Sequence, residues 1–367
     1  MAKCTTVGLP TSPAPLSRWG LNLILLLGSC VVAFAVAEIA LRIVRPVSTV
    51  AYRLDADLGY RLGANQETRA VSQDYDVVIR TNSAGFHDVE HALAKPSDVY
   101  RIVVLGESFV EALELGTEDG FTQQLERRVQ AWTSGKRVEV INLGISGTGP
   151  AQYYRVLELQ GLKYQPDLVI MAVLPDNDFR DSYQALGGAI SKPYYRIEAD
   201  NSLRLLPPHV SDQTASVRFL LQKSAFLQLV RKAVVALPVE EWLGQVGLLA
   251  PFVGVKIQDS PLTIPPDWFV YVAEPPASWQ EAYRVTLRMV EEAAKLANRH
   301  QARFLVMTIG STATVEDRWA EALASYPDAG RVRWEFDRPE RAIAGLGERV
   351  GFDVINLVEP FRRDYAV

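Results

Sequence analysis

The stretch YRIVVLGESF, Tyr100 to Phe109, joins a short apolar run to a small polar turn. Arg101 to Leu105 is rich in β-branched residues, a composition typical of a strand that is buried on both faces. The run stops at Gly106, and Ser108 follows two residues later. This order places a small polar side chain at the carboxyl end of a predicted parallel strand, which is where open α/β sheets bind their ligands.

The same arrangement occurs twice more along the chain. The apolar run at 138–142 (VEVIN) ends just before Gly144, and the run at 168–174 (LVIMAVL) ends just before Asn177. Helical patterns fill the gaps, at 121–132 and 151–161. A β-α-β-α-β order with short connections predicts parallel strands and right-handed crossovers. We therefore expect Ser108, Gly144 and Asn177 to converge on one edge of one sheet.

Each of these three residues has a chemical role and a structural alternative. The Ser108 hydroxyl can attack an acyl carbonyl if a base takes its proton, but a serine after a strand is commonly a turn or cap residue. The backbone N–H groups of Gly144 and Ser108 and the side-chain amide of Asn177 can stabilise the resulting oxyanion. Alone, Gly144 indicates a turn and Asn177 a loop-stabilising side chain. Their occurrence after three successive strands favours a catalytic site.

At these positions the chain resembles the SGNH or GDSL-like hydrolases. GESF at 106–109 resembles the first block of that family, NLGISGTG at 142–149 the second and PDND at 175–178 the third. The sequence TNSAGF at 81–86 also resembles the lead-in of membrane-anchored members, so that the resemblance covers roughly 82–361. It implies a flavodoxin-like, three-layer α/β/α fold with a central parallel sheet. It also implies that Ser108 is the nucleophile, with Gly144, Asn177 and the Ser108 amide forming the oxyanion hole.

The chain departs from the family pattern at three places. Glu107 stands where the family usually has Asp, so that the turn carrying Ser108 holds one extra methylene, and Pro175 stands where the third block usually has Gly. The fourth block, Asp-x-x-His, supplies the orienting acid and the base, but here Asp364 is followed three residues later by Val367. We expect the sequence to be a fragment whose reading frame continues; a true loss of the block is the alternative.

None of the four histidines is expected to replace that base. His87 and His91 precede the first core strand and are expected at its amino end, away from the crevice. His300 closes a predicted helix, where it would interact with the helix dipole, and His209 lies in a Pro-rich connection.

The N-terminal part predicts a disordered tail at 1–18 and a membrane anchor at 19–44. Residues 1–18 are polar, and 19–44 contains seventeen residues, Leu21 to Ala37, with Asn22 and Ser29 as the polar interruptions. With its flanks this segment is long enough to span a bilayer as a helix. Ala35-Val36-Ala37 also fits a signal-peptide cleavage site. We favour an uncleaved single-pass anchor, because the helical pattern continues through 38–42; the family resemblance places the domain outside the cytoplasm, in the periplasm.

The remaining sequence predicts a lead-in segment at 45–98, with a strand at 76–80, and one hydrolase-like domain at 99–367. An insertion at about 179–276 interrupts this domain. The insertion is expected to contain a hairpin at 194–206, a packing or membrane-surface helix at 217–237, and a Pro-rich loop over the site at 261–276. Beyond it we expect helices at 278–300, 319–326 and 342–350 and strands at 304–309 and 352–357. Ser311 is a second crevice hydroxyl or a turn residue.

Composition limits the partners of the chain. The net charge of −5 and the absence of long Lys/Arg runs argue against a nucleic-acid partner. The two cysteines, Cys4 and Cys30, lie before or within the apolar segment, so the rest of the chain has no Cys-based metal site or disulfide framework. The glycines of Gly144-x-x-Gly147-x-Gly149 do not have the spacing of a nucleotide-binding loop.

These observations predict a membrane-anchored serine esterase that acts through an acyl-enzyme on Ser108. Its partners would be an ester or acylated carbohydrate or lipid substrate and the bilayer, and the chemistry requires no metal or organic cofactor. Two alternatives remain open. One is an O-acyltransferase (acetyltransferase) acting on an envelope polysaccharide, and the other is a catalytically silent, membrane-tethered binding or assembly protein on the same fold.

Overall fold

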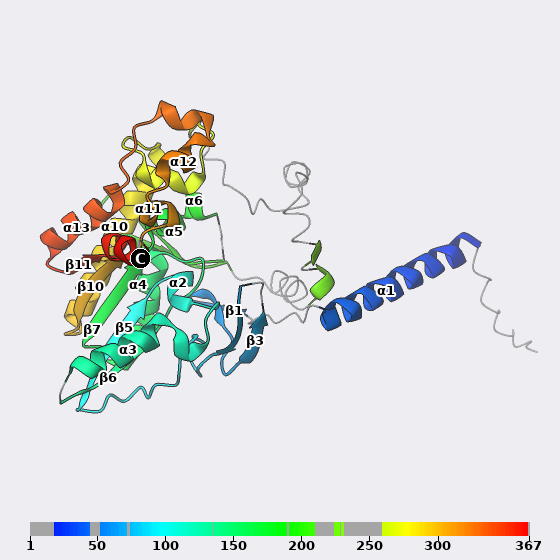
Figure 1. Ribbon diagram of the computed structural model, residues 1–367, viewed down its shortest axis with the longest axis horizontal. Helices are drawn as coiled ribbons and strands as arrows, with labels where there is room; N and C mark the ends of the chain where they lie inside the picture. Colours follow the sequence, from blue (N-terminus) through cyan, green and yellow to red (C-terminus); the bar gives the residue numbers. More distant parts are fainter. Residues whose placement is uncertain are drawn as a thin grey trace, which may run out of the picture.

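The computed structural model describes residues 18–44, 52–71, 74–133, 135–188, 191–209, 224–227, 229–230 and 259–365. Figure 1 shows an α/β domain and one long N-terminal helix that extends away from it. Residues 1–17 of the tail predicted at 1–18, and most of the predicted helix at 217–237, lie outside the described residues.

Five parallel strands form the central sheet, in the order β11-β10-β7-β5-β6. In that order they are β11 (Asp353–Asn356), β10 (Arg303–Thr308), β7 (Leu168–Val173), β5 (Val99–Leu105) and β6 (Arg137–Asn142). The register pairs Val104 of β5 with Asn142 of β6 and Leu105 with Met171 of β7. β5 therefore lies between the other two strands; β6 ends opposite Val104, and β7 continues to Val173, two residues past the partner of Leu105. The predicted flavodoxin-like fold class is confirmed.

Helices cover both faces of the sheet because successive residues of each strand point to opposite faces. Val103 and Leu105 of β5 belong to the larger core cluster, with residues of α4 (Pro150–Leu159), α10 (Ala277–Arg299) and α13 (Arg338–Val350). Ile102 and Val104 pack on the other face with α3 (Phe121–Trp132). Both faces of β5 are thus covered, which explains why its sequence is apolar throughout rather than alternating.

Antiparallel hairpins lie outside the central sheet. In the lead-in segment β1 (Tyr52–Asp55) pairs with β2 (Gly59–Leu62), and β3 (Glu67–Val71) pairs with the predicted strand β4 (Asp76–Arg80). The predicted hairpin of the insertion is confirmed as β8 (Tyr194–Ile197) and β9 (Leu203–Leu206). Its turn places Asn201 in the left-handed region, with φ at 63°, which Asn tolerates better than most residues.

Short helices and turns make up the rest of the domain. The α-helices are α2 (Ser108–Glu111), α5 (Pro175–Ser182), α6 (Gln184–Gly187), α11 (Thr312–Val315), α12 (Trp319–Ala324) and α14 (Val358–Tyr365). The 3₁₀ turns are η1 (Thr117–Asp119), η2 (Gly161–Tyr164), η3 (Pro266–Tyr271) and η4 (Pro327–Arg331). The first turns of α2 and α5 directly follow β5 and β7, and these two turns position the candidate site.

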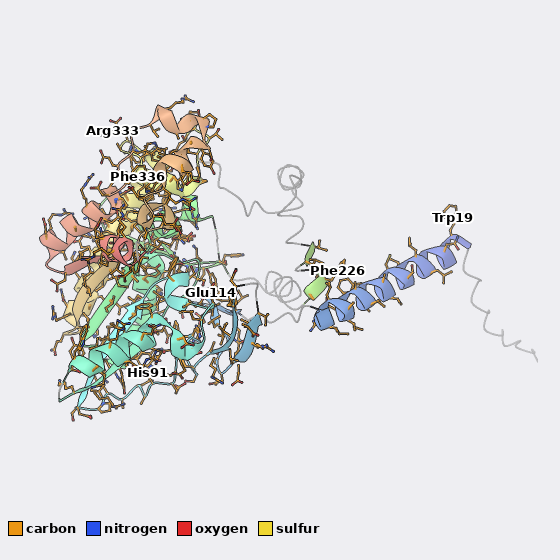
Figure 2. The ribbon with its side chains drawn as sticks, in the orientation of Figure 1. Trp19, His91, Glu114, Phe226, Arg333 and Phe336 are labelled. Atoms are coloured by element: carbon orange, nitrogen blue, oxygen red, sulfur yellow. The ribbon has the colours of Figure 1, made fainter. Side chains whose placement is uncertain are left out.

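The N-terminal helix α1 (Arg18–Val44) contains one segment, Leu25–Ile43, that is long and apolar enough to cross a membrane. Its large apolar side chains are exposed in the isolated chain. Trp19 lies at the end of α1 far from the α/β domain, whereas Phe226 of the insertion lies beside the other end (Figure 2). A signal sequence near the N-terminus has the same length and composition as such a span.

Candidate active site

The three residues predicted to form the site follow three neighbouring strands. Ser108 is the first residue of α2, after β5; Gly144 follows β6; and Asn177 lies in the first turn of α5, after β7. Because β5 lies between β6 and β7 and all three strands run parallel, all three residues lie at one edge of the sheet. The sheet therefore brings these residues to the crevice where α/β proteins bind ligands.

A tight turn carries Ser108. A Cβ on Gly106 would lie 2.1 Å from Cγ2 of Val110, so this position requires glycine for α2 to fold back over the strand end. Glu107 caps α2: its carboxylate accepts hydrogen bonds from the N–H of Phe109, at 2.9 Å, and from the N–H of Ser108. The extra methylene of Glu107, relative to Asp, is thus accommodated by a side chain that curls back over its own helix.

The Ser108 hydroxyl is half-buried and donates a hydrogen bond to Oε2 of Glu107. This carboxylate therefore fixes the direction of Oγ. It also holds the Ser108 N–H, one of the predicted oxyanion donors. A substrate oxygen that used this amide would have to replace the carboxylate as its acceptor.

Gly144 is packed against the helix that carries the serine. A Cβ at this position would lie 2.4 Å from the backbone nitrogen of Glu111 and 2.9 Å from Cβ of Val110, so any larger residue would push α2 away. The Gly144 N–H donates to Oδ1 of Asn142 at 2.9 Å. Its predicted role in an oxyanion hole therefore also requires an exchange of acceptor.

Asn142 holds this part of the site together, and sequence reasoning missed it. Its side-chain amide donates to the carbonyl oxygen of Val110 at 2.7 Å, while its own N–H donates to Oδ2 of Asp88 at 2.8 Å. Asn142 is buried. A polar residue that closes an apolar strand next to a glycine was the available signal, because a buried amide needs partners of its own.

Asn177 differs from Gly144 in having an unused polar atom. Its Oδ1 is buried and has no hydrogen-bond partner within the described part of the chain. An asparagine that merely stabilised its loop would have this oxygen bonded to a nearby N–H. The Asn177 amide thus retains hydrogen-bonding capacity at the crevice. Its loop is set by Gly149, where a Cβ would lie 2.4 Å from the carbonyl oxygen of Asp178.

Several carboxyl groups around the crevice have raised pKa values. Burial raises the pKa of Glu111 to about 7, against the opposing effect of hydrogen bonds from Ser146 and Tyr52. Burial, together with the charge of Glu107, raises the pKa of Asp178 well above its usual range. Asp178 is bonded to the hydroxyl of Tyr153 at 2.9 Å. Raised carboxyl pKa values in a crevice are typical of functional sites, although ion-pair networks also produce them.

A second group of polar side chains lies at the ends of β7 and β10. Burial raises the pKa of Asp176 to about 6, and the hydroxyls of Tyr271 and Ser311 donate hydrogen bonds to its carboxylate. Ser311 also caps α11, so its predicted turn role is confirmed. Tyr271 belongs to the Pro-rich segment at 261–276, which therefore contacts the residue next to Asn177. Tyr271 itself is fully buried rather than exposed.

The structure corrects the predicted place of His87. Its Nδ1 lies 2.6 Å from the carbonyl oxygen of Glu111, in α2, and its Nε2 lies 3.0 Å from Oγ1 of Thr117. His87 is therefore at the carboxyl end of β5, beside the crevice, and not at the amino end. The prediction was wrong because the lead-in chain enters the domain at the crevice side and only then runs toward the start of β5. Both ring nitrogens are engaged and buried.

The other histidines are also not bonded to Ser108. Nε2 of His91 lies 3.2 Å from Oδ2 of Asp88. The same carboxylate accepts from the N–H of Asn142, the last residue of β6. His91 therefore does not lie only at the amino end of the sheet, where it was predicted. His300 caps the C-terminus of α10, just before β10 begins, and His209 is exposed. Across the described ranges, the acceptor that contacts the Ser108 hydroxyl is Glu107.

No group of three or more His, Cys, Asp or Glu side chains among the described residues is arranged to hold a metal ion.

Comparisons with known proteins give structural matches alone. No protein-family model and no curated protein matches the chain. An acetyl xylan esterase matches with 11% identity over 72% of this chain and 80% of its own, at a TM-score of 0.34. A GDSL-like lipase from Bacteroides thetaiotaomicron matches with 10% identity over 74% of each chain, at a TM-score of 0.31.

A lipase/acylhydrolase from Enterococcus faecalis is similar at 11% identity over 71% of this chain and 77% of its own, with a TM-score of 0.32. The site described above rests on the residues and contacts of this chain.

Proposed function

We propose that this chain is a serine esterase, an acyl hydrolase whose nucleophile is Ser108. The observation that carries the proposal is the convergence of Ser108, Gly144 and Asn177 at the carboxyl ends of three adjacent parallel strands. Ser108 stands at the start of a helix, is half-buried and has its hydroxyl directed to a carboxylate. A serine that only closed a turn would not require the close packing of Gly144 against its helix. It would also not require Asn177, whose amide oxygen has no partner among the described residues, at the same edge of the sheet.

In the proposed reaction Oγ of Ser108 attacks the carbonyl carbon of an ester. A C–O bond forms to Oγ, its proton passes to the Glu107 carboxylate, and the carbonyl oxygen becomes an oxyanion. Collapse of this intermediate breaks the bond to the alcohol, which leaves with the proton, and the acyl group remains on Ser108. Water then attacks the acyl-enzyme by the same route, releasing the acid and the free serine.

The oxyanion needs donors that are held in place before the reaction begins. We assign the side-chain amide of Asn177 as the first donor, because Asn177 lies in the first turn of α5, at the same edge of the sheet as Ser108. The N–H groups of Ser108 and Gly144 join it when the substrate oxygen replaces their acceptors, Glu107 and Asn142. Removing one such donor typically lowers kcat by about 100-fold to 1,000-fold.

Hydrolysis of short-chain nitrophenyl esters by the full chain in detergent tests this function. Ser108→Ala should abolish the serine-dependent turnover, since the acyl group then has no acceptor. Ser202→Ala is the matched control, because Ser202 is an exposed turn residue of the β8–β9 hairpin. Equal ester hydrolysis by the wild type and Ser108→Ala would reject the esterase and leave the silent binding protein as the better account.

We further propose that α1 anchors the protein in a bilayer, with the α/β domain on the periplasmic side. The apolar segment of α1 supports this proposal, because it has the length of a span and exposes its large side chains. The expected outcome is that the protein stays with membranes after washing at alkaline pH, with an intact N-terminus by mass. A mature chain that begins near residue 38 would show instead that the helix is a cleaved signal sequence.

A further inference from the structure

Glu111 lies in α2 three residues after Ser108 and takes no part in the proposed chemistry. Its side chain is 1% exposed. One of its oxygens, Oε2, accepts three hydrogen bonds: from the Ser146 N–H at 3.2 Å, from the Ser146 hydroxyl, and from the hydroxyl of Tyr52. This single carboxylate therefore joins the serine helix, the loop after β6, and strand β1 of the lead-in segment.

The loop after β6, residues 143–149, is also held from two other sides. The hydroxyl of Tyr60, in β2, lies 2.9 Å from the carbonyl oxygen of Ser146. Nζ of Lys192 donates to the carbonyl oxygen of Gly147 at 2.7 Å, and Lys192 is itself buried and paired with Asp181 at 3.2 Å. The carbonyl oxygen of Ser146 therefore accepts from a phenol and that of Gly147 from an ammonium group.

Two of these contacts come from one hairpin. Tyr52 and Tyr60 lie on the paired strands β1 and β2, and their rings meet edge to face with centroids 5.7 Å apart. The hairpin is the first described element after α1. It lies beside α2 at the edge of the α/β domain (Figure 1). The first described element after the apolar helix along the chain thus contacts the loop that carries Gly144.

The loop at 143–149 packs directly against α2, with no room for a side chain at Gly144. The backbone nitrogen of Glu111 lies 2.4 Å from where a Cβ of Gly144 would be, so loop and helix are in direct contact. A displacement of the loop by about 1 Å would move the Gly144 N–H away from the oxyanion, and such misplacements cost catalysis on the order of 100-fold.

We propose that Glu111 is a positioning residue, which holds the loop at 143–149 against the serine helix and couples both to the β1–β2 hairpin. The effect on the rate rests on the proposed function, whereas the coupling itself does not. The hairpin after the apolar helix is then part of the framework of the active site. Loss of its Tyr52 contact should loosen the loop, because the Tyr52 hydroxyl is bonded to Glu111.

The ionisation of Glu111 gives this coupling a pH dependence. Burial raises the pKa of Glu111 to about 7, hydrogen bonds from Ser146 and Tyr52 oppose the rise, and the charge of Glu107 adds to it. His87 contacts the Glu111 carbonyl oxygen, and burial lowers its pKa, so it stays uncharged there. Because the pKa is raised in the folded chain, the closed loop favours the protonated carboxyl, so ionisation of Glu111 near pH 7 weakens the closed loop relative to an opened, solvated one.

Hydrogen exchange of the full chain in detergent, resolved at the Ser146 amide, tests the coupling directly. In the wild type, protection corrected for the intrinsic rate should fall about tenfold between about pH 6 and about pH 8, because opening lets the carboxyl ionise at its ordinary pKa. Glu111→Gln stays neutral and should remove this fall with pH. Tyr52→Phe removes one hydrogen bond to Oε2, so it should lower the protection by about tenfold, and it serves if Glu111→Gln does not fold.

Two controls match these variants. Glu114→Gln removes an exposed carboxylate three residues further along the chain, and Tyr75→Phe removes a phenol from the other lead-in hairpin region. Figure 2 labels Glu114 at the surface of the domain. Both controls should leave the Ser146 amide unchanged. Wild-type protection in both Glu111→Gln and Tyr52→Phe would overturn the proposal.

Turnover then tests the positioning role separately. With an active wild type, Tyr52→Phe should lower kcat by about tenfold or more with a smaller change in KM, because the substrate still binds but the donor is misplaced. An unchanged kcat alongside altered exchange would overturn the positioning role. An inactive wild type would reject the esterase, while the exchange result would still decide the coupling.

Discussion

Glu107 makes two kinds of hydrogen bond beside Ser108, the proposed nucleophile. Its carboxylate caps α2 through the N–H groups of Ser108 and Phe109, and it also receives the Ser108 hydroxyl. The longer side chain explains how both kinds of bond fit: the extra methylene lets the carboxylate curl over the first turn of the helix. The departure from the usual Asp therefore preserves the turn.

Replacing Glu107 by Gln separates the cap from the proton acceptor. The amide oxygen of Gln still caps the helix, so the free energy of unfolding should fall by only about 1 kcal/mol. The amide cannot take the hydroxyl proton, so kcat should fall by about 100-fold or more. Steady-state kinetics and thermal unfolding measure the two effects. Turnover within twofold of the wild type would mean that another group is the base.

Gly144→Ala tests the contact between the loop and the serine helix. The new methyl group would lie 2.4 Å from the Glu111 nitrogen, so α2 or the loop has to shift. We expect a destabilisation of about 1–3 kcal/mol, as for other overpacked sites, and a loss of ester hydrolysis. Gly330→Ala is the control, because a Cβ there meets nothing within 4 Å. Equal unfolding midpoints for the two variants would contradict the packing described here.

At the scale of elements, Arg101 joins the start of β5 to three neighbouring segments. Its guanidinium is fully buried and donates to Glu139 of β6 at 2.8 Å, to the carbonyl oxygen of Tyr164 at 2.8 Å, and to that of Ala92 at 2.6 Å. A buried arginine with all of these partners fixes the lead-in chain and η2 to the central sheet.

Arg101→Met should destabilise the domain by about 3–5 kcal/mol, because it leaves Glu139 and three carbonyl groups, those of Ala92, Leu93 and Tyr164, without their buried donor. Arg137→Met is a matched control. Arg137 pairs with the same carboxylate at 2.8 Å, but its side chain is 55% exposed, so its loss should cost less than about 1 kcal/mol. Urea unfolding of both variants gives the comparison. Similar losses would contradict the assignment of Arg101 as the buried link.

The core strands and main helices could be predicted from the sequence because each has a strong period or a continuous apolar run. The helix at 121–132 has the predicted bounds, and the strand predicted from Arg101 begins two residues earlier, at Val99. The path of the lead-in chain could not be predicted, since 81–98 has no regular element and no periodicity. This is why His87 was placed at the wrong end of β5.

The site was only partly predictable for the same reason. Strand ends place Ser108, Gly144 and Asn177 at one edge, which follows from local patterns alone. The residues that hold them come from contacts distant in the sequence. Glu111 on a short helix looks like an exposed charge, and its partner Tyr52 is 59 residues away. Asn142 is bonded to Asp88, 54 residues away. No local pattern specifies these pairs.

At the scale of the whole molecule, buried acids should make stability depend on pH. Burial raises the pKa of Glu340 to about 7 and that of Asp176 to about 6, and Glu111 reaches about 7. Between the ordinary carboxyl pKa and these values the folded chain binds more protons than the unfolded chain. The free energy of unfolding should therefore fall as the pH rises from about 4 to about 7, by several kcal/mol in total.

Glu340→Gln is the variant that tests this account, because Glu340 is 7% exposed and neither of its carboxyl oxygens has a partner in the described part of the chain. The neutral amide should remove on the order of 3 kcal/mol of the pH dependence. Denaturant unfolding at a series of pH values measures it. A wild type that becomes more stable from about pH 5 to about pH 7 would contradict the predicted sign.

The central claim is that Ser108 is an activated nucleophile, and labelling with a fluorophosphonate tests it most directly. The full-length protein is treated with the reagent, digested, and the modified peptide is identified by mass. The account predicts one adduct on Ser108 in the wild type and none in Ser108→Ala. Equal labelling of the two proteins, or no adduct on Ser108 in a folded wild type, would contradict it.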